Sequence, residues 1–144
     1  CARPRELADP DEDDHYDALG DLGVAAGLAD DLDARACGIS DANMNGQGKV
    51  DEAWRFVAPA TGEYKIAALS DTNIDLVVYV LALGDDGTCG ACLGFTDSGG
   101  AGDIDERVVA LAAGDAVVIV VDGKTTTHAG AYLVDVYACG DACE

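Results

Sequence analysis

A dense run of carboxylates near the amino terminus offers the plainest chemistry in this sequence. It comprises Asp11, Glu12, Asp13, Asp14 and Asp17. Like charges packed this closely repel one another, and a divalent cation would neutralise them, because hard cations such as Ca²⁺ take oxygen ligands. The run therefore predicts a calcium site that fixes this segment against the rest of the protein. A solvated, unordered segment is the alternative.

A second set of oxygen ligands follows further along the chain. Asp41, Asn43 and Asn45, followed by Gly46 and, after five residues, by Glu52, satisfy the spacing of an EF-hand loop. An EF-hand needs a helix on each side, whereas the residues after Glu52 predict a strand, so the literal match is accidental. We expect either a calcium-binding loop without those helices or a solvated Asn/Gly turn.

The cysteines form an even set of six: Cys1, Cys37, Cys89, Cys92, Cys139 and Cys143. With only two histidines in the chain, a zinc site is unconvincing and disulfides are favoured. Oxidised cysteines indicate a location outside the cytosol, extracellular or at the cell surface. We expect a local bridge between Cys89 and Cys92, and the pairing of the other four stays open.

Cys1 has three interpretations. Bacterial lipoproteins begin with a lipid-bearing cysteine, so Cys1 is a candidate for a lipid anchor. A disulfide within or between subunits is the second interpretation, and an ordinary chain boundary is the third. No apolar run is long enough for a transmembrane helix, so we expect no transmembrane segment.

The charge balance is lopsided. The chain of 144 residues carries 28 acidic and 8 basic residues, for a formal net charge of −20. Nucleic acids and anionic lipids are bound through lysine and arginine, so both are excluded as expected partners. The apolar content of 49% fits one domain with a substantial core.

Glycine-led alternating segments predict strands. Gly62, Gly114 and Gly130 each precede residues in which apolar side chains recur two apart, as in a strand that leaves a tight turn. Strands are expected at residues 53–58, 63–69, 76–83, 93–96, 107–111, 116–121 and 131–137. Residues 22–34 fit a weak strand or an Ala-rich turn of helix, and Gly23 and Gly27 favour the strand. Trp54 and Phe56 share one face. The fold class is all-β: a jelly-roll-like antiparallel β-sandwich of seven or eight strands at residues 22–144, with an extended acidic N-terminal arm, residues 1–21.

Two of these segments are apolar on both faces. They are residues 76–81 and 117–121. Such runs mark central strands covered on each side, or a face that meets a partner.

The order of motifs resembles the bacterial pre-peptidase C-terminal domain family. The motifs lie at residues 54–64, 71–79, 105–106, 112–114, 121–123 and 130–132, and residues 12–18 look like that family's acidic leading segment. The resemblance covers most of residues 12–138. It implies a jelly-roll-like β-sandwich that is attached to secreted proteases and other extracellular proteins and is not catalytic. Some members, such as the collagen-binding domains of clostridial collagenases, bind calcium through the acidic leading segment.

Catalysis finds little support, because no serine lies in a Gly-x-Ser-x-Gly context and only two histidines are present. We expect a non-catalytic extracellular module, stabilised by calcium, that binds a protein or carbohydrate ligand at the cell surface. The alternative is a structural subunit that binds copies of itself, forming a fibre or surface layer through the N-terminal arm and intersubunit disulfides or calcium.

Overall fold

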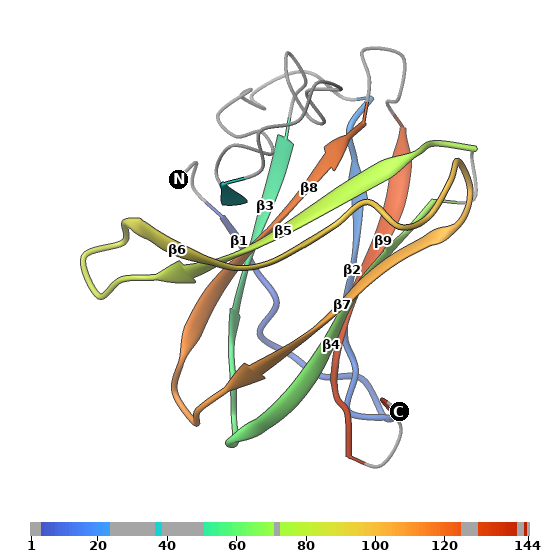
Figure 1. Cartoon of the computed structure of the whole chain (residues 1–144). Coiled ribbons are helices and arrows are strands. Elements are labelled where there is room, and N and C mark those ends of the chain that lie inside the picture. Colours follow the sequence, from blue (N-terminus) through green and yellow to red (C-terminus); the bar gives the residue numbers. More distant parts are fainter. Residues whose placement is uncertain are drawn as a thin grey trace.

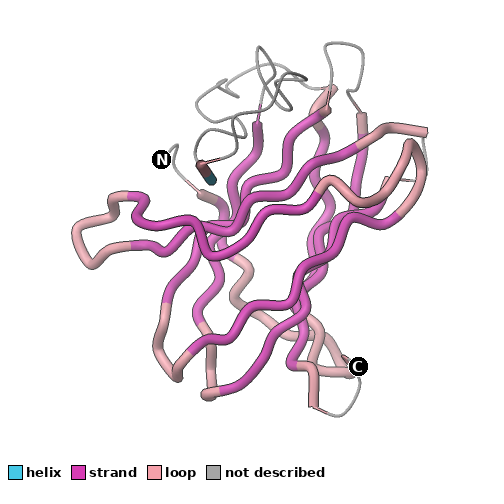
Figure 2. Tube along the Cα trace, in the orientation of Figure 1, coloured by secondary structure: helices cyan, strands magenta, loops and turns pink. Residues whose placement is uncertain are grey.

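The glycine-led, β-branched segments form strands in the computed structural model of the chain (Figure 1). The structure describes residues 4–23, 37–38, 51–70, 73–124, 130–140 and 143. Strands joined by loops make up almost all of this described part (Figure 2). No helix among these residues is long and apolar enough to cross a membrane.

The strands form two sheets. The five-stranded sheet has the order β1 (Arg5–Glu6), β3 (Asp51–Val57), β8 (Ala116–Gly123), β5 (Leu76–Leu83), β6 (Cys89–Thr96). The four-stranded sheet has the order β2 (Tyr16–Asp21), β9 (Ala131–Ala138), β4 (Gly62–Leu69), β7 (Ile104–Leu111). All neighbours are antiparallel except β1 and β3, which are parallel. The predicted antiparallel β-sandwich is therefore confirmed.

The core lies between the two sheets and follows the period-two alternation of the strands. Trp54, Phe56, Tyr64 and Ile66 are each at most 2% exposed and belong to one cluster with the inward residues of β8 and β9. Burying one such side chain contributes roughly 1.5–3 kcal/mol. The predicted shared face of Trp54 and Phe56 is confirmed, and it is the inward face of β3.

The two-sided apolar runs are the central strands β5 and β8 of the five-stranded sheet. Their outward residues form a second cluster, Val77, Tyr79, Val118 and Val120, each at most 1% exposed. Cys37 and Phe95 pack against this cluster. Both faces are therefore covered within the chain, and a partner is not needed to explain the pattern.

The N-terminal arm is extended, as expected, but it is not separate from the sandwich. β1 pairs with β3 in one sheet, and β2 pairs with β9 in the other. Leu7, between these strands, is 5% exposed. With these two strands the described residues contain nine, rather than seven or eight. The expected strand in residues 22–34 lies almost entirely outside the described residues.

The predicted Cys89–Cys92 bridge is wrong. Cys92 is joined to Cys37, and Cys139 is joined to Cys143, with Cα atoms 5.0 and 4.9 Å apart. Cys89 is also disulfide-bonded, and Cys1 lies outside the described residues. Cys89 and Cys92 both belong to strand β6, opposite Leu83 and Leu81 of β5. An extended strand holds residues three apart farther from each other than a tight turn does. A disulfide needs Cα atoms within about 7 Å.

Candidate functional site

An unbroken row of aliphatic side chains crosses the outer face of the four-stranded sheet. Leu19 of β2 lies opposite Leu133 of β9, Leu133 lies opposite Leu69 of β4, and Leu69 lies opposite Ile104 of β7. We call these residues the aliphatic row. Leu19 is 73% exposed and Ile104 is 49% exposed. Neighbouring strands are about 4.8 Å apart, so the row is roughly 14 Å long.

Strand alternation places these side chains on the outside. Tyr132 and Val134 are buried in the core, so Leu133 between them points to the outer face. Asp105 is likewise buried, and Ile104 before it points outward. Within each strand, the alternation of the sequence indicates which side chains point outward. It did not reveal that the strand register aligns the four residues.

A shallow hollow lies within this face. It has a volume of about 400 Å³ and is lined by Leu19, Leu69, Ala131, Tyr132 and Leu133. Its lining is therefore mainly aliphatic. Scattered exposed leucines are common on protein surfaces, whereas contiguous apolar patches with a concave centre mark places where a ligand or partner binds.

Carboxylates border the aliphatic row on β2. Asp17 comes two residues before Leu19, Asp21 comes two residues after it, and both are exposed. Asp17 also lies directly opposite Asp135 of β9. Like charges in directly opposed positions destabilise a sheet by roughly 0.2–1 kcal/mol. Negative charge is therefore concentrated at this edge of the face.

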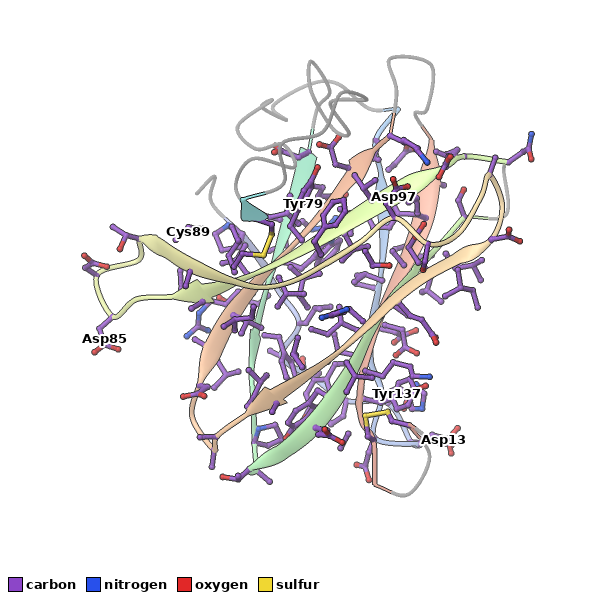
Figure 3. All side chains as sticks on the ribbon, in the orientation of Figure 1. Asp13, Tyr79, Asp85, Cys89, Asp97 and Tyr137 are labelled. Carbon is purple, nitrogen blue, oxygen red and sulfur yellow. A yellow bond between two sulfur atoms is a disulfide. The ribbon has the colours of Figure 1, made fainter. Side chains whose placement is uncertain are left out.

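His15 compensates part of that charge. Its Nδ1 atom lies 3.0 Å from both carboxylate oxygens of Asp135, and its ring stacks on Tyr137 with centroids 4.4 Å apart. The hydrogen bond with Asp135 raises the pKa of His15 above 6.5. Tyr137 and Asp13 lie at the same end of the molecule (Figure 3).

The predicted calcium ligands of the N-terminal arm are divided between a turn and a strand. One carboxylate oxygen of Asp11 accepts hydrogen bonds from the backbone N–H groups of Asp13 and His15, which lowers the pKa of Asp11. Asp14 adopts a positive φ of 61° in the same turn, while Asp17 belongs to β2. Among the described residues, no three carboxylate, imidazole or thiol groups are arranged to hold one ion. Calcium binding by Asp11, Glu12, Asp13, Asp14 and Asp17 stays a prediction.

The EF-hand-like loop lies mostly beyond the described part. Asp41, Asn43 and Asn45 are outside it, so calcium binding there also stays a prediction. Glu52, the closing position of that spacing, is 7% exposed and its carboxylate faces the protein interior. Its Oε1 accepts a hydrogen bond from Arg5 and its Oε2 accepts one from Tyr132. Sequence reasoning missed this role, because Arg5 and Tyr132 are far from Glu52 in the chain.

A separate charged group lies at the other end of the sandwich, where Figure 3 shows Asp97 far from Asp13. Lys124 Nζ lies 2.9 Å from Asp97 and 3.5 Å from Asp75, and these contacts raise the pKa of Lys124. Asp105 nearby is fully buried and accepts a hydrogen bond from the Gly99 N–H. Burial raises the pKa of Asp105.

The architecture places the chain in the class of two-sheet antiparallel β-sandwiches with an open, partly apolar outer face. The pre-peptidase C-terminal domain of a Bacillus anthracis collagenase is similar, with a TM-score of 0.51 and 12% identity over 83% of this chain and 86% of that one. The resemblance seen in the sequence is thus confirmed for the fold.

A second solved structure is also similar. It is CorA, described as a surface-associated copper-binding protein of Methylomicrobium album, with a TM-score of 0.54 and 8% identity over 94% of this chain and 98% of that one. No protein-family model matches the sequence, and no curated protein matches it. At these identities the likeness establishes the fold alone.

Proposed function

We propose that this chain is a non-catalytic extracellular binding module whose protein or carbohydrate ligand docks on the outer face of the four-stranded sheet. The observation that carries the proposal is the aliphatic row, whose ends Leu19 and Ile104 are the most exposed large apolar side chains of the described residues, with half-buried Leu69 and Leu133 between them. The disulfides and the similar folds of a collagenase domain and a surface-associated protein support an extracellular setting.

Leu19 has the most exposed surface of the aliphatic row to bury against a ligand. A leucine that is 73% exposed gains little from folding, and its complete burial by a ligand would contribute roughly 1.5–3 kcal/mol. The hollow beside it can receive one ligand side chain. A few well-buried contacts supply most of the affinity of typical interfaces, and a ligand side chain in this hollow would be one of them.

The test is a binding screen with matched variants. Immobilised protein is exposed to soluble polysaccharides and to purified extracellular proteins, and binding is followed by biolayer interferometry. Leu19→Ser and Leu133→Ser alter the outer face without touching the core. Leu93→Ser, at a site 42% exposed on β6 of the other sheet, is the control.

We expect the two row variants to weaken binding about tenfold or more and the control to bind like the wild type. Circular dichroism melting of each variant checks that the fold is intact. A ligand that binds equally well to all three variants would contradict the proposed location. Chemical conversion of a ligand would contradict the non-catalytic function.

Calcium stabilisation of the fold and a lipid anchor on Cys1 are further proposals.

Self-assembly is the alternative function. The exposed aliphatic row is the observation that favours assembly, since a second copy could cover it. Sedimentation velocity of unreduced protein over a hundredfold concentration range tests it, and a constant monomer would exclude it. The intact mass of native protein tests the lipid.

A further inference from the structure

We infer that the ligand of this face is a cationic segment of another protein, with an aliphatic residue that fills the hollow and a lysine or arginine two residues away on each side. The inference rests on the proposed function, because it names the ligand class of the same face. It follows from the shape of the hollow, the spacing of charges on β2 and the charge of the whole chain.

The hollow determines the kind of side chain at the centre of the ligand segment. It is lined by Leu19, Leu69 and Leu133, together with Ala131 and Tyr132. Aliphatic walls favour a leucine, isoleucine or valine side chain, because such a group is dehydrated at little cost. A sugar ring would bring hydroxyl groups into a pocket with few polar partners, and each unpaired hydroxyl would lose a hydrogen bond to water.

The spacing of the carboxylates on β2 indicates which residues of the ligand lie on either side of its aliphatic residue. Asp17, Leu19 and Asp21 point to the same face at consecutive period-two positions. Leu19 is therefore about 6.6–6.8 Å from each of Asp17 and Asp21 along the strand. An extended polypeptide has the same period, so a basic residue, an aliphatic residue and a basic residue at alternate positions would face Asp17, the hollow and Asp21. The carboxylates thus match a Lys-x-Leu-x-Lys pattern in register.

The opposed pair Asp17 and Asp135 adds a specific reason for positive charge. His15 contacts Asp135, whereas Asp17 is exposed on the edge strand of the sheet. A lysine ammonium or an arginine guanidinium beside Asp17 would relieve the repulsion between the two carboxylates. A neutral ligand would leave that repulsion in place.

The net charge disfavours the competing occupants. A second copy of this chain also carries −20, and a two-fold contact through this face would bring both acidic borders together. An anionic lipid surface would be repelled for the same reason. A cationic partner would instead be attracted from a distance and oriented by the same field.

The probe is a synthetic peptide with blocked ends and the sequence Ser-Lys-Ser-Leu-Ser-Lys-Ser. One matched peptide replaces leucine by serine, and another replaces both lysines by glutamate. Each is titrated into ¹⁵N-labelled protein at low ionic strength, and amide shifts are followed by NMR. A short peptide with one anchor is expected to bind with a Kd of about 1 mM.

We expect the Lys/Leu peptide to shift the amides around Leu19, Leu133 and Leu69. The serine peptide should bind about tenfold more weakly, and the glutamate peptide should not bind. Asp17→Asn and Asp21→Asn should each weaken binding about two- to fivefold, and added salt should do the same. Asp85→Asn, a similarly exposed acid on the β5–β6 turn, should leave binding unchanged.

Failure of this inference and of the proposed function are distinguishable. If the peptide does not bind but a polysaccharide binds and is lost in Leu19→Ser, the ligand class is wrong and the binding module stands. If all three peptides bind alike, or if the shifts lie on the other sheet, the cationic ligand is overturned. Concentration-dependent shifts of the same amides without peptide would assign the face to a second copy instead.

Discussion

The hydroxyl group of Tyr132 donates a hydrogen bond of 2.7 Å to Oε2 of Glu52, and this contact joins the four-stranded sheet to the five-stranded sheet. The same hydroxyl accepts a hydrogen bond of 2.7 Å from the indole N–H of Trp54. Arg5 donates to the other oxygen of Glu52 and its guanidinium carbon lies 4.2 Å from the centre of the Trp54 ring. A Cβ atom at Gly20 would overlap both Tyr132 and Glu52, so glycine is required there.

Replacing Tyr132→Phe removes that hydroxyl. Trp54 and Glu52, which are 1% and 7% exposed, would each keep a buried polar group without this partner. We expect the free energy of unfolding to fall by about 1–3 kcal/mol, measured by urea denaturation. Tyr137→Phe on the outer face of the same strand is the control and should cost much less. Equal losses in both variants would show that the cross-sheet bond contributes little.

His15 should make stability depend on pH near neutrality. Its folded pKa lies above the unfolded value of 6.5 because of Asp135. The stabilisation is therefore fully present below pH 6.5 and is lost as the pH rises through the folded pKa. The pair is partly exposed, so we expect less than about 1 kcal/mol.

NMR titration of the His15 ring checks this directly. We expect its pKa to fall toward 6.5 in Asp135→Asn, because the hydrogen-bonding charge is removed. The control Asp9→Asn removes an exposed charge of the same segment and should have a much smaller effect. A His15 pKa at or below 6.5 in the wild type would refute the ion pair.

Asp105→Asn should stabilise the protein at neutral pH. Burial raises the folded pKa of Asp105 above 3.8, so the folded state holds this proton more tightly than the unfolded chain. Its contribution to stability is therefore lost as the pH rises from 3.8 through the folded pKa. Asparagine keeps the acceptor for the Gly99 N–H and carries no charge.

The measurement is the difference in unfolding free energy between Asp105→Asn and the wild type from pH 4 to 8. We expect the difference to grow with pH in favour of the variant. Asp85→Asn, at an exposed turn, controls for the general loss of negative charge. A variant that is less stable at pH 7 would mean that the Asp105 carboxylate is used in its charged form.

The two described disulfides should contribute unequally to the free energy of unfolding. Cys37 and Cys92 are 55 residues apart, and Cys139 and Cys143 are 4 apart. Loop-closure entropy gives about 4 kcal/mol for the long loop and about 2 kcal/mol for the short one. Paired Cys→Ser variants compared by chemical denaturation test this order, and peptide mapping without reduction tests the pairing. A Cys89–Cys92 peptide would contradict the structure.

Calcium should raise the melting temperature if either predicted set of ligands binds it. Binding to the native state alone, at a free concentration one hundred times Kd, stabilises by about 2.7 kcal/mol. Thermal melting in millimolar calcium is compared with melting in EGTA. Asp13→Asn tests the N-terminal arm and Asp41→Asn tests the loop. Identical melting curves of the wild type in calcium and in EGTA would show that calcium does not stabilise the protein.

Local pattern alone predicted the strands. Trp54 and Phe56 alternate with polar or exposed residues, so their inward position follows from the two-residue period of a strand. The even set of cysteines similarly indicated disulfides. The N-terminal arm was harder to interpret, because the charges of Asp17 and Asp21 obscured the inward alternation of Tyr16 and Ala18 in β2.

The sequence by itself determined the two-sheet class and the inward faces, because these depend on the chemistry of neighbouring residues. The partner of Cys92, the burial of Glu52 and the alignment of Leu19 with Leu133 were decided only by the tertiary structure. Each of these depends on strand register between segments far apart in the chain. A shift of one residue in β2 would turn Leu19 into the core and Ala18 outward. The candidate binding surface therefore exists because of pairing that no local pattern encodes.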